Sequence, residues 1–188
     1  MTPYGRAIVV QRGEVKMALV VLDAIGLFYD DIVSIRNSLQ ADLSIDYVMI
    51  ASTHSHQAPD LIGIWGKEVG VTGVNDRYLE NVKKKSSQAI RQAHSRLEEV
   101  QIEHYQDNNK AKDFVEDTRS PWVLDHALRG LVFYSKKTKA VIGSLISWTN
   151  HPEVLWSKNT LISSDFVHYV REGIENRRCQ SLWTLIAT

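Results

Sequence analysis

A nearly continuous apolar run, Met17 to Leu22, constrains the fold of this chain more than any other feature of its sequence. An apolar run without alternation is typical of a strand that is buried on both faces. The surrounding stretch "RAIVVQRGEVKMALVVLDA" predicts two strands, Arg6–Gln11 and Val15–Asp23, joined by a turn at Arg12–Gly13. A strand buried on both faces needs further layers, and 188 residues are enough to supply them.

Helix and strand patterns alternate after this strand pair. "DDIVSIRNSLQADL" has helical spacing, with apolar residues recurring on one stripe, and "DYVMIAS" predicts a short strand. Asn75 is a candidate cap for a helix over 76–98. The apolar stripe of the first helix consists of Phe28, Ile32, Ile35 and Leu39. The remaining predicted elements are the strands "VQIEHY", "LRGLVFYS" and "AVIGSLISWT" and the helix "SSDFVHYVREGIENRR". This order predicts an α/β fold with a mixed, partly parallel β-sheet and flanking helices.

Composition excludes several classes of function. The 22 basic and 22 acidic residues cancel, so no overall charge attracts the chain to nucleic acid or to an anionic membrane. No apolar stretch approaches the ~20 residues of a transmembrane helix, and the first residues lack the pattern of a signal peptide. The single cysteine, Cys179, excludes an internal disulfide and a cysteine-built zinc site. These features do not distinguish one cellular compartment from another.

Three predicted buried strands end in a residue that can bind a metal ion. The first ends at Asp23, the second runs into His54, and the third runs into His151. Ligands of open α/β sheets bind beyond the carboxyl ends of the strands, so we expect these side chains to meet there. Imidazole and carboxylate groups suit zinc or a similar divalent ion.

Each of these residues also has a purely structural interpretation. The pair His54 and His56 places two rings on one face if the strand continues, but such pairs also occur without metal. His151 is equally consistent with a hydrogen-bonded structural residue, and Asp23 with a cap on the following helix. The residues alone leave these alternatives open. The other histidines have no such context and are interpreted as structural: His94, His104, His126 and His168.

Four segments of the chain resemble, in order and rough spacing, segments of the neutral/alkaline (non-lysosomal) ceramidases and their bacterial relatives. They are "TPYGRAIVV", "ASTHSHQAP", "DTRSP" and "SWTNHPEVLWSKNTLISSDFVHYVREGIE", and together they span about residues 3 to 175. The resemblance implies a zinc-dependent hydrolase that cleaves the amide of ceramide (N-acylsphingosine) into fatty acid and sphingosine. It also implies that zinc polarises the amide carbonyl.

The resemblance gives individual residues a role. His54 and His151 match the two histidines that bind zinc in that family. His56 matches a catalytic histidine near the substrate. Arg119 matches an arginine that contacts the substrate, where a guanidinium holds a substrate oxygen or stabilises a developing oxyanion.

The chain also departs from the family pattern. Gln57 and Ala58 replace a Ser-Gly pair, and Pro152 and Glu153 follow the second histidine. The family completes its zinc site with a glutamate and a tyrosine far downstream of the matched segments. The resemblance therefore implies that residues 1–188 are a single partial catalytic domain, truncated at both ends relative to the family. The tail "RRCQSLWTLIAT" does not resemble the family's next strand. The candidates for a third metal ligand, or for a residue that contacts a ligand, are Asp23, His56 and Asp165.

Three hypotheses follow. The first is a zinc-dependent amide hydrolase of neutral ceramidase type, present as a fragment. The second is a non-catalytic remnant that binds metal weakly, and the third is a metal-dependent hydrolase of a different amide or ester. The two hydrolase hypotheses imply a small-molecule or lipid amide or ester as partner, and none of the three implies nucleic acid. A lipid substrate needs an apolar trough beside the metal. Two alternatives are open for the apolar residues after the histidine loop: they line such a trough, or they pack under the loop as part of the core. These residues are Leu61, Ile62, Ile64 and Trp65.

Overall fold

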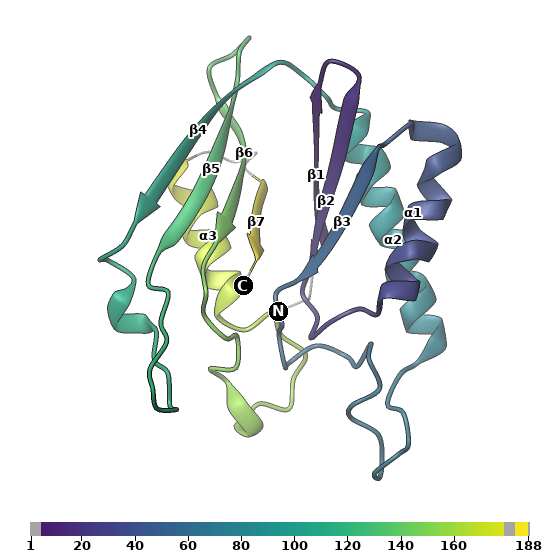
Figure 1. Ribbon diagram of the computed structural model, residues 1–188, viewed down its shortest axis with the longest axis vertical. Helices are drawn as coiled ribbons and strands as arrows, with labels where there is room; N and C mark the ends of the chain where they lie inside the picture. The colour runs from purple at the N-terminus through teal and green to yellow at the C-terminus, as the bar shows by residue number, and fades with distance from the viewer. Residues whose placement is uncertain (1–4, 179–182, 188) are drawn as a thin grey trace.

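A computed structural model describes residues 5–178 and 183–187, which form two sheets and three α-helices (Figure 1). In the first sheet, β1 (Gly5–Arg12) and β2 (Val15–Leu22) form an antiparallel hairpin. β3 (Tyr47–Ser52) pairs in parallel with the other edge of β2. The parallel pairing requires a crossover, which α1 (Tyr29–Leu43) provides.

The second sheet has the order β4-β5-β6-β7. Its first three strands pair antiparallel, and β7 pairs in parallel with β6. The strands are β4 (Val100–Asp107), β5 (Leu128–Ser135), β6 (Val141–Ser147) and β7 (Trp183–Ala187), and the remaining helices are α2 (Asp76–His94), α3 (Phe166–Arg178) and the short 3-10 helices η1 (Lys112–Phe114) and η2 (Trp156–Lys158). A strand in the tail was not expected from the sequence, and Cys179 lies outside the described residues.

The main core lies between the first sheet and the helix pair α1 and α2 (Figure 1). Val20 of β2 is fully buried, and Ile35, Leu39 and Ile90 pack against it from the helices. Phe28 was expected on the same stripe but is 58% exposed, because it precedes α1 as its N-cap residue. The predicted burial of β2 on both faces holds for Val20 to Leu22, whereas Met17, at the start of the apolar run, is 40% exposed.

Helix α2 begins as predicted and ends earlier than predicted. The Asn75 side chain accepts a hydrogen bond from the Tyr78 backbone N–H at 3.0 Å, which satisfies one of the free amides of the first turn. The helix ends at His94 rather than at residue 98. The Ser95 and Arg96 amides close its last turn on the carbonyls of Arg91 and Ala93.

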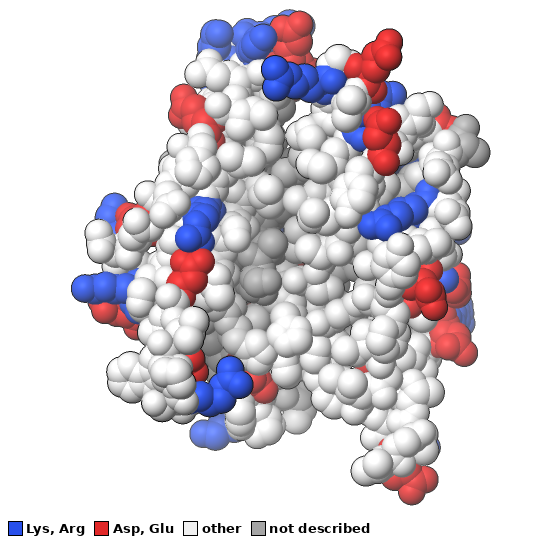
Figure 2. Space-filling view, viewed as in Figure 1, with Lys and Arg blue, Asp and Glu red and all other residues white. Residues whose placement is uncertain are grey.

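The α/β class and the partly parallel pairing are confirmed, with the strands divided between two small sheets. β3 and β6 belong to different sheets, yet their carboxyl ends lie at the same end of the molecule (Figure 1). Charged side chains of both signs are interspersed around the periphery of the face in Figure 2. Within the described part of the chain, no helix has both the length and the apolar composition needed to span a bilayer.

A groove of about 1070 Å³ lies between β1 and the strands β4, β5 and β6 of the second sheet. It is lined by β1, the end of α2 and residues such as Phe133 and Ile142. His54, His56 and His151 are not among its lining residues. The groove is therefore a separate feature from the strand ends where the sequence places the candidate site.

Candidate metal centre

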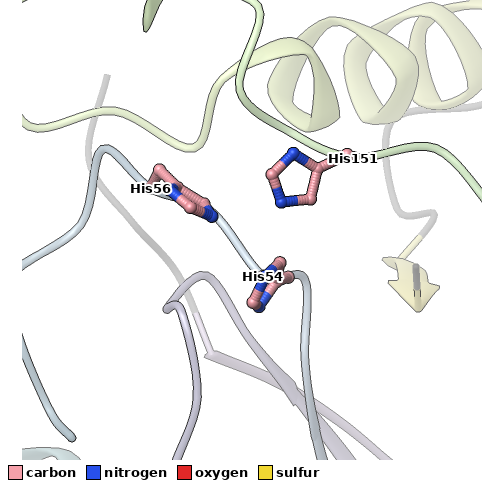
Figure 3. A group of neighbouring side chains, drawn as sticks. All are labelled: His54, His56 and His151. Carbon is pink, nitrogen blue, oxygen red and sulfur yellow. The ribbon is translucent and has the colours of Figure 1, made fainter. Parts of the chain in front are cut away.

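Three imidazole rings meet where β3 and β6 end. The ring of His54 lies 5.0 Å from those of His56 and His151, centroid to centroid, and the rings of His56 and His151 are 4.7 Å apart. One ring nitrogen from each residue lies within 4.8 Å of the other two. Figure 3 shows the three rings gathered around one point, two carried by the loop after β3 and one by the loop after β6. The predicted meeting of His54 with His151 is thus present in the structure.

The backbone after β3 turns sharply to present the first two rings. The Thr53 N–H donates to the Leu22 carbonyl at 2.8 Å, which holds the end of β3 against the end of β2. His54 then adopts φ 60°, in the left-handed region that few residues other than glycine occupy. The buried Ser55 hydroxyl donates to the Ser163 carbonyl at 3.1 Å and so fixes this loop to the segment before α3.

Each of the three rings has an acceptor beside its Nδ1 atom. His54 Nδ1 lies 2.7 Å from the Ile25 carbonyl oxygen. His151 Nδ1 lies 3.1 Å from Glu153 Oε2, and His56 Nδ1 lies 3.4 Å from Glu153 Oε1. A carbonyl or carboxylate oxygen at this position favours a proton on Nδ1, because neither group can donate one. The Nε2 lone pair of each ring is then available for a metal ion, as in many protein metal sites.

The electrostatic surroundings of His56 also fit a ligand. Burial lowers the pKa of His56, the Glu153 carboxylate opposes that shift, and His151 and His54 add to it, so that the net pKa is below its usual range. A lowered pKa favours the neutral imidazole, which is the form that coordinates metal. Within the described residues, His56 Nε2 is buried and has no hydrogen-bond partner. A buried nitrogen without a partner, next to two further imidazoles, fits a divalent ion of the zinc type.

The two candidate aspartates lie outside the group of potential ligands. Asp23 Oδ2 accepts a hydrogen bond from Arg171 Nη1 at 2.7 Å, and both side chains are buried. Asp165 is buried and accepts from the backbone N–H groups of Leu155 and Phe166, at 3.0 and 2.6 Å. Asp23 therefore joins β2 to α3, and Asp165 shapes the loop that follows His151.

Arg119 is not gathered with the three histidines. Its side chain is 91% exposed, and its Nε atom lies 3.9 Å from Asp117 Oδ1. Among the interactions recorded for the described residues, none links it to a histidine of the cluster. The same long loop approaches the site at another point, because Asn150 Nδ2 donates to the Phe114 carbonyl at 3.1 Å, directly before His151.

The residues proposed for an apolar trough divide into two groups. Leu61 is 2% exposed and belongs to the core, whereas Ile64 is 54% and Trp65 40% exposed. The Trp65 ring meets the His56 ring edge-on, with centroids 5.8 Å apart. The core alternative therefore holds for Leu61, and the exposed pair Ile64 and Trp65 lies on the loop beside the site.

Asp60 holds this loop together. Its carboxylate accepts hydrogen bonds from the backbone N–H groups of Ile62, Gly63 and Trp65 at 2.8 to 3.0 Å. Burial alone would raise the pKa of Asp60, but these N–H groups outweigh burial and lower it. A Cβ atom on Gly66 would lie 1.6 Å from the Val71 carbonyl oxygen, so glycine is required where the loop folds back on itself.

Glu153 is the residue of the site that sequence reasoning missed. It was noted only as a departure from the family pattern, although an acidic residue two positions after a candidate ligand was a usable signal. Carboxylates that do not themselves bind the metal commonly contact the ring nitrogen of a ligating histidine that faces away from it. Here the two oxygens of one carboxylate face two different rings.

Comparison with known proteins yields structural matches only. No family model matches the chain, and no curated protein matches it by sequence. A solved structure of a ceramidase complexed with C2 matches with a TM-score of 0.77 and 15% identity, covering 98% of this chain and 31% of the other. The neutral ceramidase of Pseudomonas aeruginosa matches with a TM-score of 0.74 and 16% identity, covering 98% and 32%. The chain spans about a third of the length of these proteins, and over that third it has the fold of a ceramidase.

Proposed function

We propose that the chain is the zinc-binding part of an amide hydrolase of neutral ceramidase type, a partial catalytic domain with His54 and His151 as zinc ligands. The observation that carries the proposal is the convergence of these two rings, from loops after β3 and β6, at a centroid distance of 5.0 Å. The ceramidase fold of the whole chain supports the same assignment. His56 completes the group, either as a third ligand or as the residue next to the substrate.

Zinc, when bound here, would supply Lewis-acid chemistry for an amide carbonyl. The contribution of the chain is to hold the ion and to keep it accessible. His54 and His151 are exposed to solvent, so a substrate can approach the group. The lowered pKa of His56 keeps its ring neutral near pH 7, in a form that can ligate or accept a proton.

The surroundings favour an apolar substrate. Ile64 and Trp65 remain exposed on the loop beside His56, and Trp156 is 59% exposed on the segment that follows His151. Exposed apolar side chains around a polar group are typical of a site that binds an acyl chain. We extend the proposal to Arg119 as a substrate contact, since its 91% exposed side chain is accessible to a ligand.

The test combines zinc binding with hydrolysis of a fluorescent ceramide and of a fluorescent short-chain amide and ester. Purified wild type is compared with H54A, H151A and the matched control H104A, whose exposed histidine lies on β4. We expect zinc to bind to wild type and H104A and to be lost in the other two, with ceramide cleaved only by the zinc-binding proteins. Wild type that binds zinc no better than H54A would overturn the proposal.

The same measurements separate the alternative hypotheses. Zinc binding without cleavage of any substrate would identify a non-catalytic metal-binding domain. Cleavage of the short-chain amide or ester, with ceramide untouched, would identify a hydrolase of a different substrate. Both results retain the metal site, and neither assigns ceramide cleavage to this chain.

A further inference from the structure

We propose that Glu153 is a positioning residue that orients His56 and His151 together, so that the Nε2 atoms of both rings face one metal ion. The inference rests on the metal site of the proposed function. It goes further by assigning to one carboxylate the simultaneous control of two rings from separate loops. It also gives a reason for the position of Glu153 between His56 and His151, which belong to different loops.

The geometry divides the carboxylate between the two rings. Oε2 lies 3.1 Å from His151 Nδ1, and Oε1 lies 3.4 Å from His56 Nδ1. The rings themselves are 4.7 Å apart, so one carboxylate spans both. The side chain of Glu153 is 28% exposed, which leaves it half-buried against the rings it faces.

The local backbone fixes where this carboxylate can lie. The Glu153 N–H donates to the His151 carbonyl at 2.9 Å, and the Trp156 N–H donates to the Glu153 carbonyl at 3.3 Å. Pro152, between the histidine and the glutamate, is buried. The turn therefore places the Glu153 carboxylate beside Nδ1 of His151, and the same carboxylate reaches His56 on the other loop.

The chemical consequence concerns which nitrogen of each ring carries the proton. A negatively charged carboxylate beside Nδ1 attracts a ring proton to that nitrogen, so Glu153 favours the Nδ1–H form of both His56 and His151. The Ile25 carbonyl has the same effect on His54. All three rings then share one tautomer, with Nε2 unprotonated, and a metal ion needs no rearrangement of protons to bind. Glu153 is the acceptor that a side-chain substitution can remove, because the Ile25 acceptor belongs to the backbone.

The experiment uses the full 188-residue chain in wild-type form and as E153A, E153Q and E172A. E172A is the matched control, because Glu172 Oε2 lies 3.3 Å from His168 Nε2 on α3 in a similar carboxylate–histidine pair. Zinc affinity is measured by competition with a chromophoric chelator, after thermal melts have shown that each variant is folded. Substitution of such outer carboxylates typically lowers metal affinity by about 10- to 100-fold. We expect that loss in E153A, a smaller loss in E153Q, whose amide oxygen can serve one ring, and no change in E172A.

A second readout does not depend on metal. ¹⁵N NMR of the histidine rings in zinc-free protein reports which nitrogen is protonated. We expect Nδ1–H for His56 and His151 in wild type and in E172A, and a shift toward Nε2–H for both in E153A. If E153A does not fold, E153Q is measured instead, and one of the two rings should change.

The two readouts separate failure of this inference from failure of the proposed function. Wild type that binds no zinc contradicts the metal site, and the tautomers still decide whether Glu153 orients the rings. Zinc affinity in E153A within two-fold of wild type, or unchanged tautomers in the zinc-free variant, would overturn the role of Glu153.

Discussion

Asp23 and Arg171 form a buried ion pair that joins the carboxyl end of β2 to α3, with Nη1 2.7 Å from Oδ2. Removal of one partner leaves a buried charge without its counter-ion, which costs about 3–5 kcal/mol in typical proteins. We therefore predict that D23N lowers the free energy of unfolding by roughly this amount. Urea denaturation followed by circular dichroism measures the change.

The control for this prediction is the exposed pair between Arg91 and Asp42, whose side chains are 37% and 52% exposed. Exposed pairs contribute at most about 1 kcal/mol, so D42N should have a small effect. Equal losses of stability in D23N and D42N would show that the buried pair has no special role.

Zinc should stabilise the folded chain if the three histidines hold it. A ligand at a hundred times its Kd adds about 2.7 kcal/mol to the free energy of unfolding. We predict that zinc raises the melting temperature of wild type, that a chelator reverses the rise, and that H151A shows neither effect. Differential scanning calorimetry at fixed protein concentration measures both. A rise of the same size in H151A would place the bound zinc elsewhere.

The stabilising effect of Asp60 should depend on pH in one direction. Because its pKa is lowered in the folded state, its carboxylate contributes stability that is complete well above the unfolded value of ~3.9. That contribution is lost as the pH falls through the lower, folded pKa. We predict that D60N is less stable than wild type at pH 7, by about 1.5–3 kcal/mol for the lost charge-assisted hydrogen bonds.

The difference between wild type and D60N should shrink as the pH is lowered through ~3.9 and below. Urea unfolding of both proteins across that range measures it. A difference that stays constant down to low pH would contradict the assigned cause, because the Asp60 carboxyl would then stabilise the loop without being ionised.

The hydrogen bond from the Tyr78 N–H to the Asn75 side chain should make a smaller contribution to the free energy of unfolding. Loss of a capping side chain costs about 1 kcal/mol, so N75A should reduce the free energy of unfolding by about that amount. N75D retains an oxygen that can accept the Tyr78 N–H and should restore most of the stability. If N75D were as unstable as N75A, the cap would not be the cause.

Local sequence patterns predicted the strands and α-helices up to α3, but not β7, and they indicated part of the candidate site. The apolar run before Asp23 and the one before His54 mark strand ends, and strand ends are where ligands bind in such folds. They did not reveal which polar side chains pair across long separations. Asp23 meets Arg171, 148 positions away, and no periodic pattern reports a contact of that kind.

The positions of side chains in loops were the second feature that the sequence did not predict. Glu153 lies in a turn, where side-chain direction depends on backbone angles rather than on periodicity, so its contact with His56 required the structure. Arg119 was assigned by resemblance alone and lies exposed on a loop. At 15% identity the fold is shared, and individual contacts in loops do not follow from it.

The left-handed backbone at His54 favours glycine, whereas the candidate metal site needs an imidazole at this position. A residue with a Cβ atom at φ 60° costs about 1 kcal/mol relative to glycine. Among variants that lack the imidazole, H54G should thus be more stable than H54A, the reverse of the usual ranking of these two residues. The imidazole at this position is therefore held against the intrinsic conformational preference of the backbone, so a glycine here would remove a candidate ligand while relieving the strain of the turn.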